Sequence, residues 1–242
     1  MRDPYLYTNS DVLINKHNIK DEKDLVEMEA EFTSTRLKQI TENPLQGDYD
    51  FKHFCDFHRW IFQDMYDWAG VPRVINIEKS EPALGGLSIE YAEFFEIERM
   101  ANSALNKMKA IEWDKLNLDE KAEKFSKSMA ELWKAHCFRE GNTRTVVTFC
   151  CQFAESRGFI LDRTLFEKHS AYVRNSLVAA SAYFSDLGDK SKPEYLIKIV
   201  RDSIENGLTI KPSIKERLEE CKIKANEQNK NNHGTKAIEK ER

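Results

Sequence analysis

The sequence lacks the features that mark several classes of protein. Residues 1–5 show no apolar stretch like the core of a signal peptide, and no apolar run approaches the ~18 residues needed to cross a membrane. The five cysteines are odd in number and scattered, without disulfide or zinc-ligand spacing. The formal net charge of −4 disfavours direct nucleic-acid binding. We therefore expect a cytoplasmic protein without a membrane anchor, with signal-independent export as the alternative.

The composition is that of a globular chain. Of the 242 residues, 40% are hydrophobic and 32% are charged, which suits one well-cored domain with appendages. Apolar residues recur at helical spacing along most of the chain. Helices are expected at about 20–40, 51–68, 89–109, 117–135, 142–157, 164–184 and 193–207. From residue 213 a charged helix is expected, followed after residue 225 by a disordered tail rich in Asn, Lys and Glu.

One stretch breaks the helical pattern. Residues 71–77 alternate in polarity and are rich in β-branched side chains, which predicts a short strand. Residues 81–87 follow with one proline and two glycines, the composition of a turn and a returning strand. Because a lone hairpin has an unpaired edge, it is either a connector or a surface that pairs with another extended chain. The predicted fold class is therefore all-α with one small β-hairpin.

Residues 136–144 place several reactive groups between two expected helices. Gly141 and Asn142 would open the second helix, whose first N–H groups lack internal partners and suit an anion such as phosphate. Arg144 lies in the first turn, where its guanidinium can grip phosphate oxygens. Glu140 offers oxygen ligands for Mg²⁺. His136, with an ordinary pKa of about 6.5, is a candidate proton acceptor. Together these groups indicate a reaction at a nucleotide phosphate.

Each of these residues also has a purely structural interpretation. A Gly-Asn pair between helices is often only a tight turn, and a histidine beside an apolar face is often structural. A non-catalytic helical interaction module would explain the apolar stripes, but not why a base, an acid, an anion site and an arginine coincide. A DNA-binding helix-turn-helix is the weakest alternative, because the helix after Asn142 is apolar and the chain is acidic.

The order of these residues resembles the signature of the Fic family, His-x-Phe-x-(Asp/Glu)-Gly-Asn-(Gly/x)-Arg-x-x-Arg. Residues 3–7, 21–25 and 64–70 also look like passages that recur in that family, so the resemblance covers roughly residues 3–207. It implies a Fic-type helical bundle with a small β-hairpin flap near the active-site loop. We expect a helical extension at 1–48, the Fic core at 49–207, and a charged helix and tail at 208–242. The signature is matched by His136, Phe138, Glu140, Gly141, Asn142 and Arg144.

The resemblance implies a protein adenylyltransferase. Most of the family is known for transferring AMP from ATP to a Ser, Thr or Tyr hydroxyl of a target protein. By this match, His136 would accept the hydroxyl proton, Glu140 would hold Mg²⁺, and Phe138 would fix the loop. The phosphates would be bound by Gly141, Asn142, Thr143 and Arg144. The flap that docks the target, about Val74 to Leu87, would act through Val74, Ile75, Asn76, Ile77, Leu84, Gly85, Gly86 and Leu87.

The sequence departs from the signature at three positions. Cys137 replaces the usual proline, Thr143 replaces the second glycine, and Val147 replaces the second arginine. In the family that arginine orients the terminal phosphate and pairs with an inhibitory glutamate. Because this arginine is replaced, a donor of UMP, phosphate or phosphocholine, as other family members use, is the alternative to ATP as a donor of AMP. A weakly active enzyme or a non-catalytic interaction module is a further alternative.

The family's inhibitory motif, (Ser/Thr)-x-x-x-Glu-(Gly/Asn), is absent from this sequence. Apart from the signature itself, a Glu precedes Gly or Asn only at Glu42 and Glu205, and the residues four positions earlier are Lys38 and Arg201. We therefore expect no built-in inhibitory helix of the known kind. Within the family this indicates a toxin-like member restrained by a separate small antitoxin, or a member without such restraint.

Overall fold

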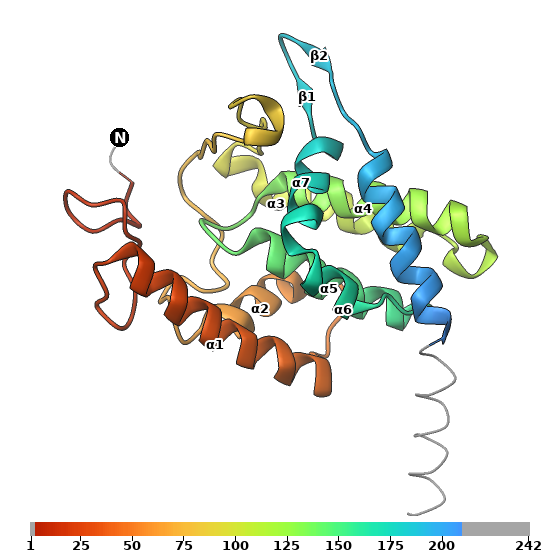
Figure 1. Ribbon diagram of the computed structural model, residues 1–242, viewed down its shortest axis with the longest axis horizontal. Helices are drawn as coiled ribbons and strands as arrows, with labels where there is room; N and C mark the ends of the chain where they lie inside the picture. The colour runs from red at the N-terminus through yellow and green to blue at the C-terminus, as the bar shows by residue number, and fades with distance from the viewer. Residues whose placement is uncertain (1–2, 210–242) are drawn as a thin grey trace, which may run out of the picture.

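The protein is described here by a computed structural model that covers residues 3–209. It is mostly helical, with one small two-stranded antiparallel hairpin, so the predicted fold class is confirmed (Figure 1). Among the described residues, no helix is long and apolar enough to span a bilayer. The charged helix and tail expected after residue 213 lie outside the described residues, and the division into an extension, a core and a tail stays a prediction.

The helices begin where the sequence offers side-chain caps. Asp21 and Asp50 accept hydrogen bonds from backbone N–H groups in the first turn of their helices, and Asn117 forms a reciprocal capping box with Glu120. The α-helices are α1 (Glu22–Glu42), α2 (Phe51–Phe62), α3 (Ile97–Ala110), α4 (Leu118–Ala135), α5 (Asn142–Ser156), α6 (Arg163–Lys168) and α7 (Ser170–Ala180). Residues 194–209 form a further helix. The 3₁₀ turns are η1 (Pro82–Leu84), η2 (Phe94–Glu96) and η3 (Trp113–Lys115), and the strands are β1 (Tyr183–Phe184) and β2 (Gly188–Asp189).

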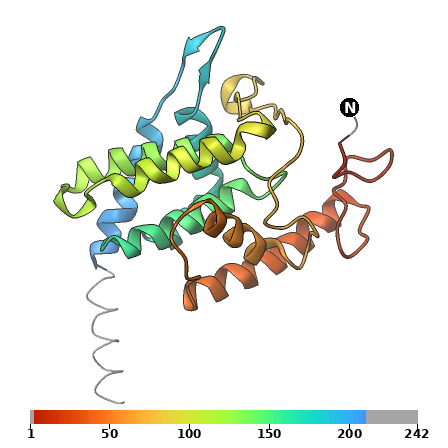
Figure 2. The same cartoon turned by 180° about the vertical axis from the view of Figure 1, so that it is seen from behind.

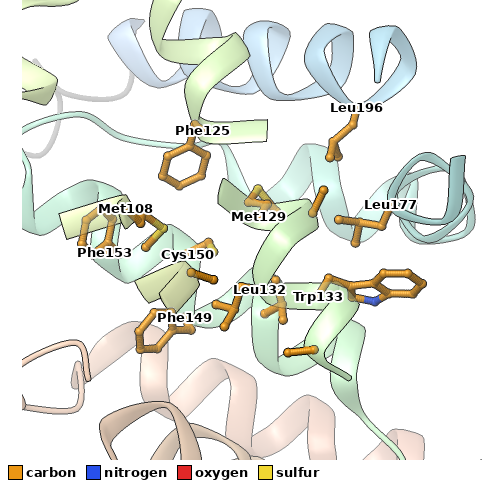
Figure 3. Packing of buried hydrophobic residues seen from close by; sticks show 14 of the residues in the cluster. Met108, Phe125, Met129, Leu132, Trp133, Phe149, Cys150, Phe153, Leu177 and Leu196 are labelled. Carbon is orange, nitrogen blue, oxygen red and sulfur yellow. The ribbon is translucent and has the colours of Figure 1, made fainter. Parts of the chain in front are cut away.

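The core is built around α4 and α5, which lie in the middle of the bundle with other helices on either side (Figures 1 and 2). Side chains from α3, α4, α5 and α7 interdigitate there (Figure 3). The Phe149 ring, fully buried on α5, meets the rings of Phe54 and Phe57 edge-on at 5.2 Å. This aromatic contact fixes α2 against α5. As a result, the loop between α4 and α5 emerges from a rigid pair of helices.

A second apolar cluster joins α1 and the turn-rich segment before it to α2. Leu25 of α1 packs with Ile61 and Phe62 near the C-terminal end of α2, and with Met65 and Tyr66 just after it. Arg36 of α1 adds a paired hydrogen bond to Asp64, at 2.6 and 2.8 Å. The N-terminal segment therefore lies directly against the helix that supports the loop at residue 141.

The hairpin does not lie where the sequence pattern placed it. Residues 71–88 contain no strand, and the two strands pair instead as Tyr183 with Asp189 and Phe184 with Gly188. The prediction of strands over residues 71–77 and 81–87 was wrong because several of their backbone groups are bound elsewhere. The Val74 N–H donates to the Tyr5 hydroxyl, and the N–H groups of Leu84 and Gly86 donate to the Glu81 carbonyl in a tight turn.

Three predicted helices also differ in extent. α2 ends at Phe62, short of the predicted residue 68. The helix predicted from residue 89 begins only at Ile97, because backbone groups before it are bound outside a helix: the Tyr91 N–H donates to the Ile89 carbonyl and the Ala92 N–H to the Lys134 carbonyl of α4. The helix predicted over 164–184 is interrupted at His169, whose backbone leaves the helical region, and it ends at Ala180 before β1.

Replacement of Phe149 by alanine should test the contact between α2 and α5. Removing this buried ring leaves a cavity, so we expect the free energy of unfolding to fall by about 3–5 kcal/mol. The matched control is Phe95→Ala, because Phe95 is 69% exposed and its loss should change stability by less than about 0.5 kcal/mol. Urea unfolding followed by circular dichroism measures both changes. Similar losses for the two variants would contradict the central role of Phe149.

Candidate active site

The signature loop leaves α4 through an unusual backbone conformation. His136 follows the last residue of α4 at φ 44° and ψ 59°, in the left-handed region that bulky side chains seldom adopt. The Arg73 guanidinium holds this conformation by donating from Nε to the His136 carbonyl at 2.8 Å, and it also donates to the carbonyls of Ile75 and Ala92. Strain held in this way is typical of functional positions.

The His136 imidazole is enclosed and has no hydrogen-bond partner. It is 3% exposed, and neither ring nitrogen meets a donor or acceptor within the described residues. The Tyr91 ring lies against it, with centroids 3.9 Å apart. Burial lowers the pKa of His136 well below its ordinary value, and the positive charges of Lys79 and Arg73 lower it further. The imidazole is therefore neutral near pH 7, the state in which it can accept a proton.

The loop after His136 is held by buried side chains that bind its backbone. Asn142 accepts from the Phe138 N–H at 2.9 Å and donates to the Phe138 carbonyl at 2.7 Å. His58 of α2 stacks on the Phe138 ring at 3.8 Å. Its Nδ1 accepts from the Gly70 N–H, so its Nε2 carries the proton donated to the Glu140 carbonyl at 3.0 Å. The loop is thus fixed from α2 and from α5.

Gly141 directly precedes α5, at a position where no other residue would fit. Its φ of 79° lies in the left-handed region, and an added Cβ would stand 2.2 Å from the Phe62 ring. This close approach seats the start of α5 directly on α2. The first N–H bonded within the helix is that of Thr145, to the Gly141 carbonyl. The N–H groups of residues 142–144 therefore have no acceptor inside the helix and form an anion-binding end.

The predicted phosphate-binding residues divide into two groups. The Asn142 side chain is hydrogen-bonded within the loop, and the Thr143 hydroxyl accepts from the Trp133 indole N–H at 2.9 Å. These two residues therefore offer a phosphate their backbone N–H groups and not their side chains. The Arg144 guanidinium turns toward α1, where it pairs with Glu29, donates to the Thr33 hydroxyl, and lies 4.7 Å above the Phe62 ring. In this conformation Arg144 is bound to the N-terminal segment.

Glu140 lies between the loop and the segment predicted as the flap. One carboxylate oxygen accepts from the Gly141 N–H at 2.9 Å, and the other pairs with the Lys79 ammonium at 3.1 Å. Burial by itself would raise the pKa of Glu140, but the Lys79 charge and the Gly141 N–H outweigh it and hold the pKa below its ordinary value. Within residues 3–209 no group of three metal-binding side chains gathers. One ionised carboxylate nevertheless fits Mg²⁺, which takes most of its ligands from substrate phosphates and water.

The covering segment, residues 79–91, lies against the imidazole through its Tyr91 ring, and two ion pairs hold its start. Lys79 binds Glu140, and the fully buried Glu81 receives a paired hydrogen bond from Arg174 of α7 at 2.7 and 2.9 Å. The Tyr91 hydroxyl donates to Glu81 at 3.2 Å. The predicted flap residues thus lie beside the signature loop, although as a loop and not a hairpin.

Several residues that build the site were not found from the sequence. His58 falls within the apolar helix predicted over 51–68, Arg73 falls within the strand predicted over 71–77, and the pair of Glu81 with Arg174 joins positions 93 residues apart. Glu29 was one of many acidic residues on α1. No local pattern distinguishes these side chains, because each acts on a partner that is distant in sequence.

Replacement of Gly141 by alanine should separate steric conflict from backbone strain. The control is Gly158→Ala, which has a similar φ of 84° but no atom within 4 Å of the added Cβ. Both variants carry the backbone cost, and only Gly141→Ala also collides with Phe62. We expect Gly141→Ala to lose about 1–3 kcal/mol more than Gly158→Ala in urea unfolding. Equal losses would show that the Phe62 ring moves aside freely.

The buried histidines should make stability depend on pH. Burial lowers the pKa of His58 to about 3 and that of His136 well below its ordinary value. Both groups take up protons mainly on unfolding, so the stability they contribute is present above pH ~6.5 and is lost as the pH falls toward the folded-state pKa. At acid pH each should contribute a slope of about 1.4 kcal/mol per pH unit. Urea unfolding between pH 4 and 7 should show that His136→Gln lowers this slope by about 1.4 kcal/mol per pH unit, and an unchanged slope would contradict the burial of a neutral imidazole.

The comparison with known proteins agrees with the signature. Residues 48–154 match the sequence profile of the Fic/DOC family. "Probable protein adenylyltransferase y4lH" from Sinorhizobium fredii is 35% identical over 171 residues, which cover 69% of this chain and 83% of that protein. "Protein adenylyltransferase VbhT" from Bartonella schoenbuchensis is 32% identical over 164 residues, or 66% of this chain. That match spans only 32% of VbhT.

Solved structures show the same fold. The N-terminal Fic domain of a VirB-translocated Bep effector from Bartonella quintana superposes with a TM-score of 0.67 at 24% identity, over 87% of this chain and 97% of that one. A structure with bound ADP from the same organism gives a TM-score of 0.66 at 23% identity, over 82% and 93% of the two chains. Taken with the y4lH match, these findings confirm the predicted resemblance: the chain belongs to the Fic/DOC family.

Proposed function

We propose that this chain is a protein adenylyltransferase that moves AMP from ATP to a Ser, Thr or Tyr hydroxyl of a target protein. The observation that carries the proposal is the neutral, unpartnered imidazole of His136, which precedes the anion-binding end of α5 by a loop of five residues. A purely structural histidine at this burial would be expected to use at least one ring nitrogen, as His58 does. The names of the relatives y4lH and VbhT support the same reaction.

The proposed chemistry assigns one task to each group. His136 accepts the proton of the target hydroxyl while the hydroxyl oxygen forms a bond to the α-phosphorus. The bond from the α-phosphorus to the oxygen that bridges to the β-phosphate breaks, and pyrophosphate leaves. The N–H groups of Asn142 and Thr143 bind phosphate oxygens, and the Gly141 N–H joins them after it exchanges the Glu140 carboxylate for the nucleotide. Arg144 neutralises the leaving pyrophosphate after it exchanges Glu29 for the nucleotide.

Glu140 is the proposed ligand of Mg²⁺. Its carboxylate is ionised and lies beside the proposed phosphate site, and Lys79 occupies one of its oxygens. Mg²⁺, when bound with the nucleotide, would neutralise charge on the phosphates. The ammonium of Lys79 supplies part of this compensation while the covering segment is closed. Displacement of Lys79 would therefore free Glu140 and release one of the ion pairs that hold the covering segment.

The proposed docking surface for the target is the segment from Val74 to Leu87. Val74 and Leu87 are 57% and 47% exposed, and the stretch after Val74 is not paired with a strand within residues 3–209. An extended target peptide would pair with this backbone and bring its hydroxyl to His136. The residues proposed to act here are Val74, Ile75, Asn76, Ile77, Leu84, Gly85, Gly86 and Leu87.

A finer proposal is that the enzyme is toxin-like and is restrained by a separate small antitoxin that supplies an inhibitory helix. Its support is the absence of the inhibitory motif from this sequence, together with Val147 in place of the second signature arginine. Beside Arg144 and Val147, a groove of about 840 Å³ runs between α1 and helices α5 to α7. A helix seated there would lie against Arg144.

The reaction can be tested with the purified full chain, a cell lysate and Mg²⁺. ATP, UTP and CDP-choline are supplied separately, and modified peptides are identified by mass spectrometry. With ATP, we expect a hydroxyl residue of the target to gain the mass of one AMP group. His136→Ala should lower the rate of modification by about 10²–10⁴-fold because the general base is removed. The exposed His169→Ala should keep full activity.

The outcome also decides between donors. An adduct of UMP or phosphocholine would show that the donor is UTP or CDP-choline and not ATP. His136 would remain the proposed base. An interaction module without catalysis would give no adduct with any donor. Full activity in His136→Ala would contradict the proposed mechanism.

A further inference from the structure

A groove that none of the candidate active-site residues lines lies along the outer side of α4. It has a volume of about 430 Å³, which is large enough for a small molecule. Its walls are one face of α4, the C-terminal end of α7, the hairpin β1–β2 and the first turn of the helix at 194–209. In Figure 1 these elements are the light-green helix, the teal helix, the projecting hairpin and the blue helix.

Two buried hydroxyl groups in this groove have no partner. Ser126 of α4 is 1% exposed and Ser181 at the end of α7 is 5% exposed, and both line the groove. Within the described residues neither hydroxyl oxygen meets a donor or an acceptor. Buried hydroxyls are nearly always hydrogen-bonded in folded proteins, because a hydroxyl that leaves water without finding a new partner loses its hydrogen bonds. Two of them in one groove point to a polar ligand.

The positive groups of the groove favour an anion. Lys134 is partly buried, and among residues 3–209 it forms no ion pair; its ammonium lies 3.4 Å from the Tyr183 carbonyl and over the Tyr183 ring, and the carboxylates of Glu90 and Asp189 act on its charge from beyond ion-pair distance. Pro193 directly precedes the helix at 194–209, and its carbonyl accepts the first hydrogen bond of that helix, from the Ile197 N–H. The N–H groups of residues 194–196 therefore have no acceptor inside that helix, which gives its end a partial positive charge.

The acidic residues of the groove are mostly engaged elsewhere. Glu131 pairs with Lys107 at 3.0 Å, and Asp189 accepts from the Ser191 N–H at 2.8 Å. Glu123 is exposed at the groove's edge, as is the positively charged Lys127. The floor is apolar and includes Ala130 and the fully buried Leu196. The groove therefore places the Lys134 ammonium beside an apolar floor in a volume that suits a small molecule.

We propose that this groove binds a small organic carboxylate with a short apolar body. The carboxylate accepts hydrogen bonds from the hydroxyls of Ser126 and Ser181 and from the ammonium of Lys134. The apolar body rests on Ala130 and Leu196. The two serines thereby gain the partners that they lack, and Lys134 gains a direct charge-assisted hydrogen bond, which neither Glu90 nor Asp189 gives it among the described residues.

The test uses isovalerate and its neutral isostere isovaleramide, titrated into the full chain by calorimetry. A charge-assisted hydrogen bond to Lys134 should make isovalerate bind about tenfold more tightly than isovaleramide. Lys134→Met should bring the two affinities together, and Lys134→Arg should restore part of the difference. Ser126→Ala and Ser181→Ala should each weaken isovalerate severalfold. The matched control is Ser128→Ala, because the Ser128 hydroxyl already donates to the Lys124 carbonyl on the same helix.

Three outcomes would overturn the proposal. The first is no saturable binding of isovalerate to the wild-type chain. The second is an unchanged preference for isovalerate in Lys134→Met. The third is binding of inorganic phosphate in place of isovalerate, which would show a site for inorganic anions. Far-ultraviolet circular dichroism confirms that each variant is folded before titration, and adenylyl transfer is not needed for any of these measurements.

Discussion

The reciprocal hydrogen bonds between the Asn142 side chain and the backbone of Phe138 fix the distance across the signature loop. They hold His136 at one end of the loop and the exposed amides of α5 at the other. The remaining supports act on the same backbone, since His58 binds the Glu140 carbonyl and Arg73 binds the His136 carbonyl. Without this short bridge, the proposed base and the proposed phosphate site would belong to two independent helix ends.

The supports come from the two helices and the linking segment that pack around the loop. α2 supplies His58 and the Phe62 ring that lies against Gly141, while Arg73 follows the turn after α2. The aromatic contact of Phe149 with Phe54 and Phe57 keeps α2 at the distance that both contacts need. Packing in the core is therefore connected to the geometry of the site through one helix. The left-handed backbone at His136 persists because all these contacts act on it together.

Much of the site could be predicted because its parts are contiguous in sequence. A glycine and an asparagine at the start of an apolar helix, with a histidine and a glutamate before them, define both the helix end and the reactive groups. The starts of α4 and α5 were predicted for the same reason, since caps act locally. The strand at 74–77 failed because a β-branched pattern indicates an extended chain but does not say what the chain pairs with. Here its partners are the Tyr5 hydroxyl and the Arg73 guanidinium, which no local pattern reveals.

The covering segment at 79–91 has a consequence for the order of events at the site. It binds Glu140 through Lys79, and it is continuous with the surface proposed to dock the target. A nucleotide–metal complex that displaces Lys79 and a peptide that pairs with residues 74–78 would act on one continuous segment of the chain. If both favour its open position, each ligand must raise the affinity of the other by the same factor, since linkage between two sites is reciprocal. The enzyme would then hold ATP weakly when alone and more tightly in the presence of its target, which limits wasteful hydrolysis.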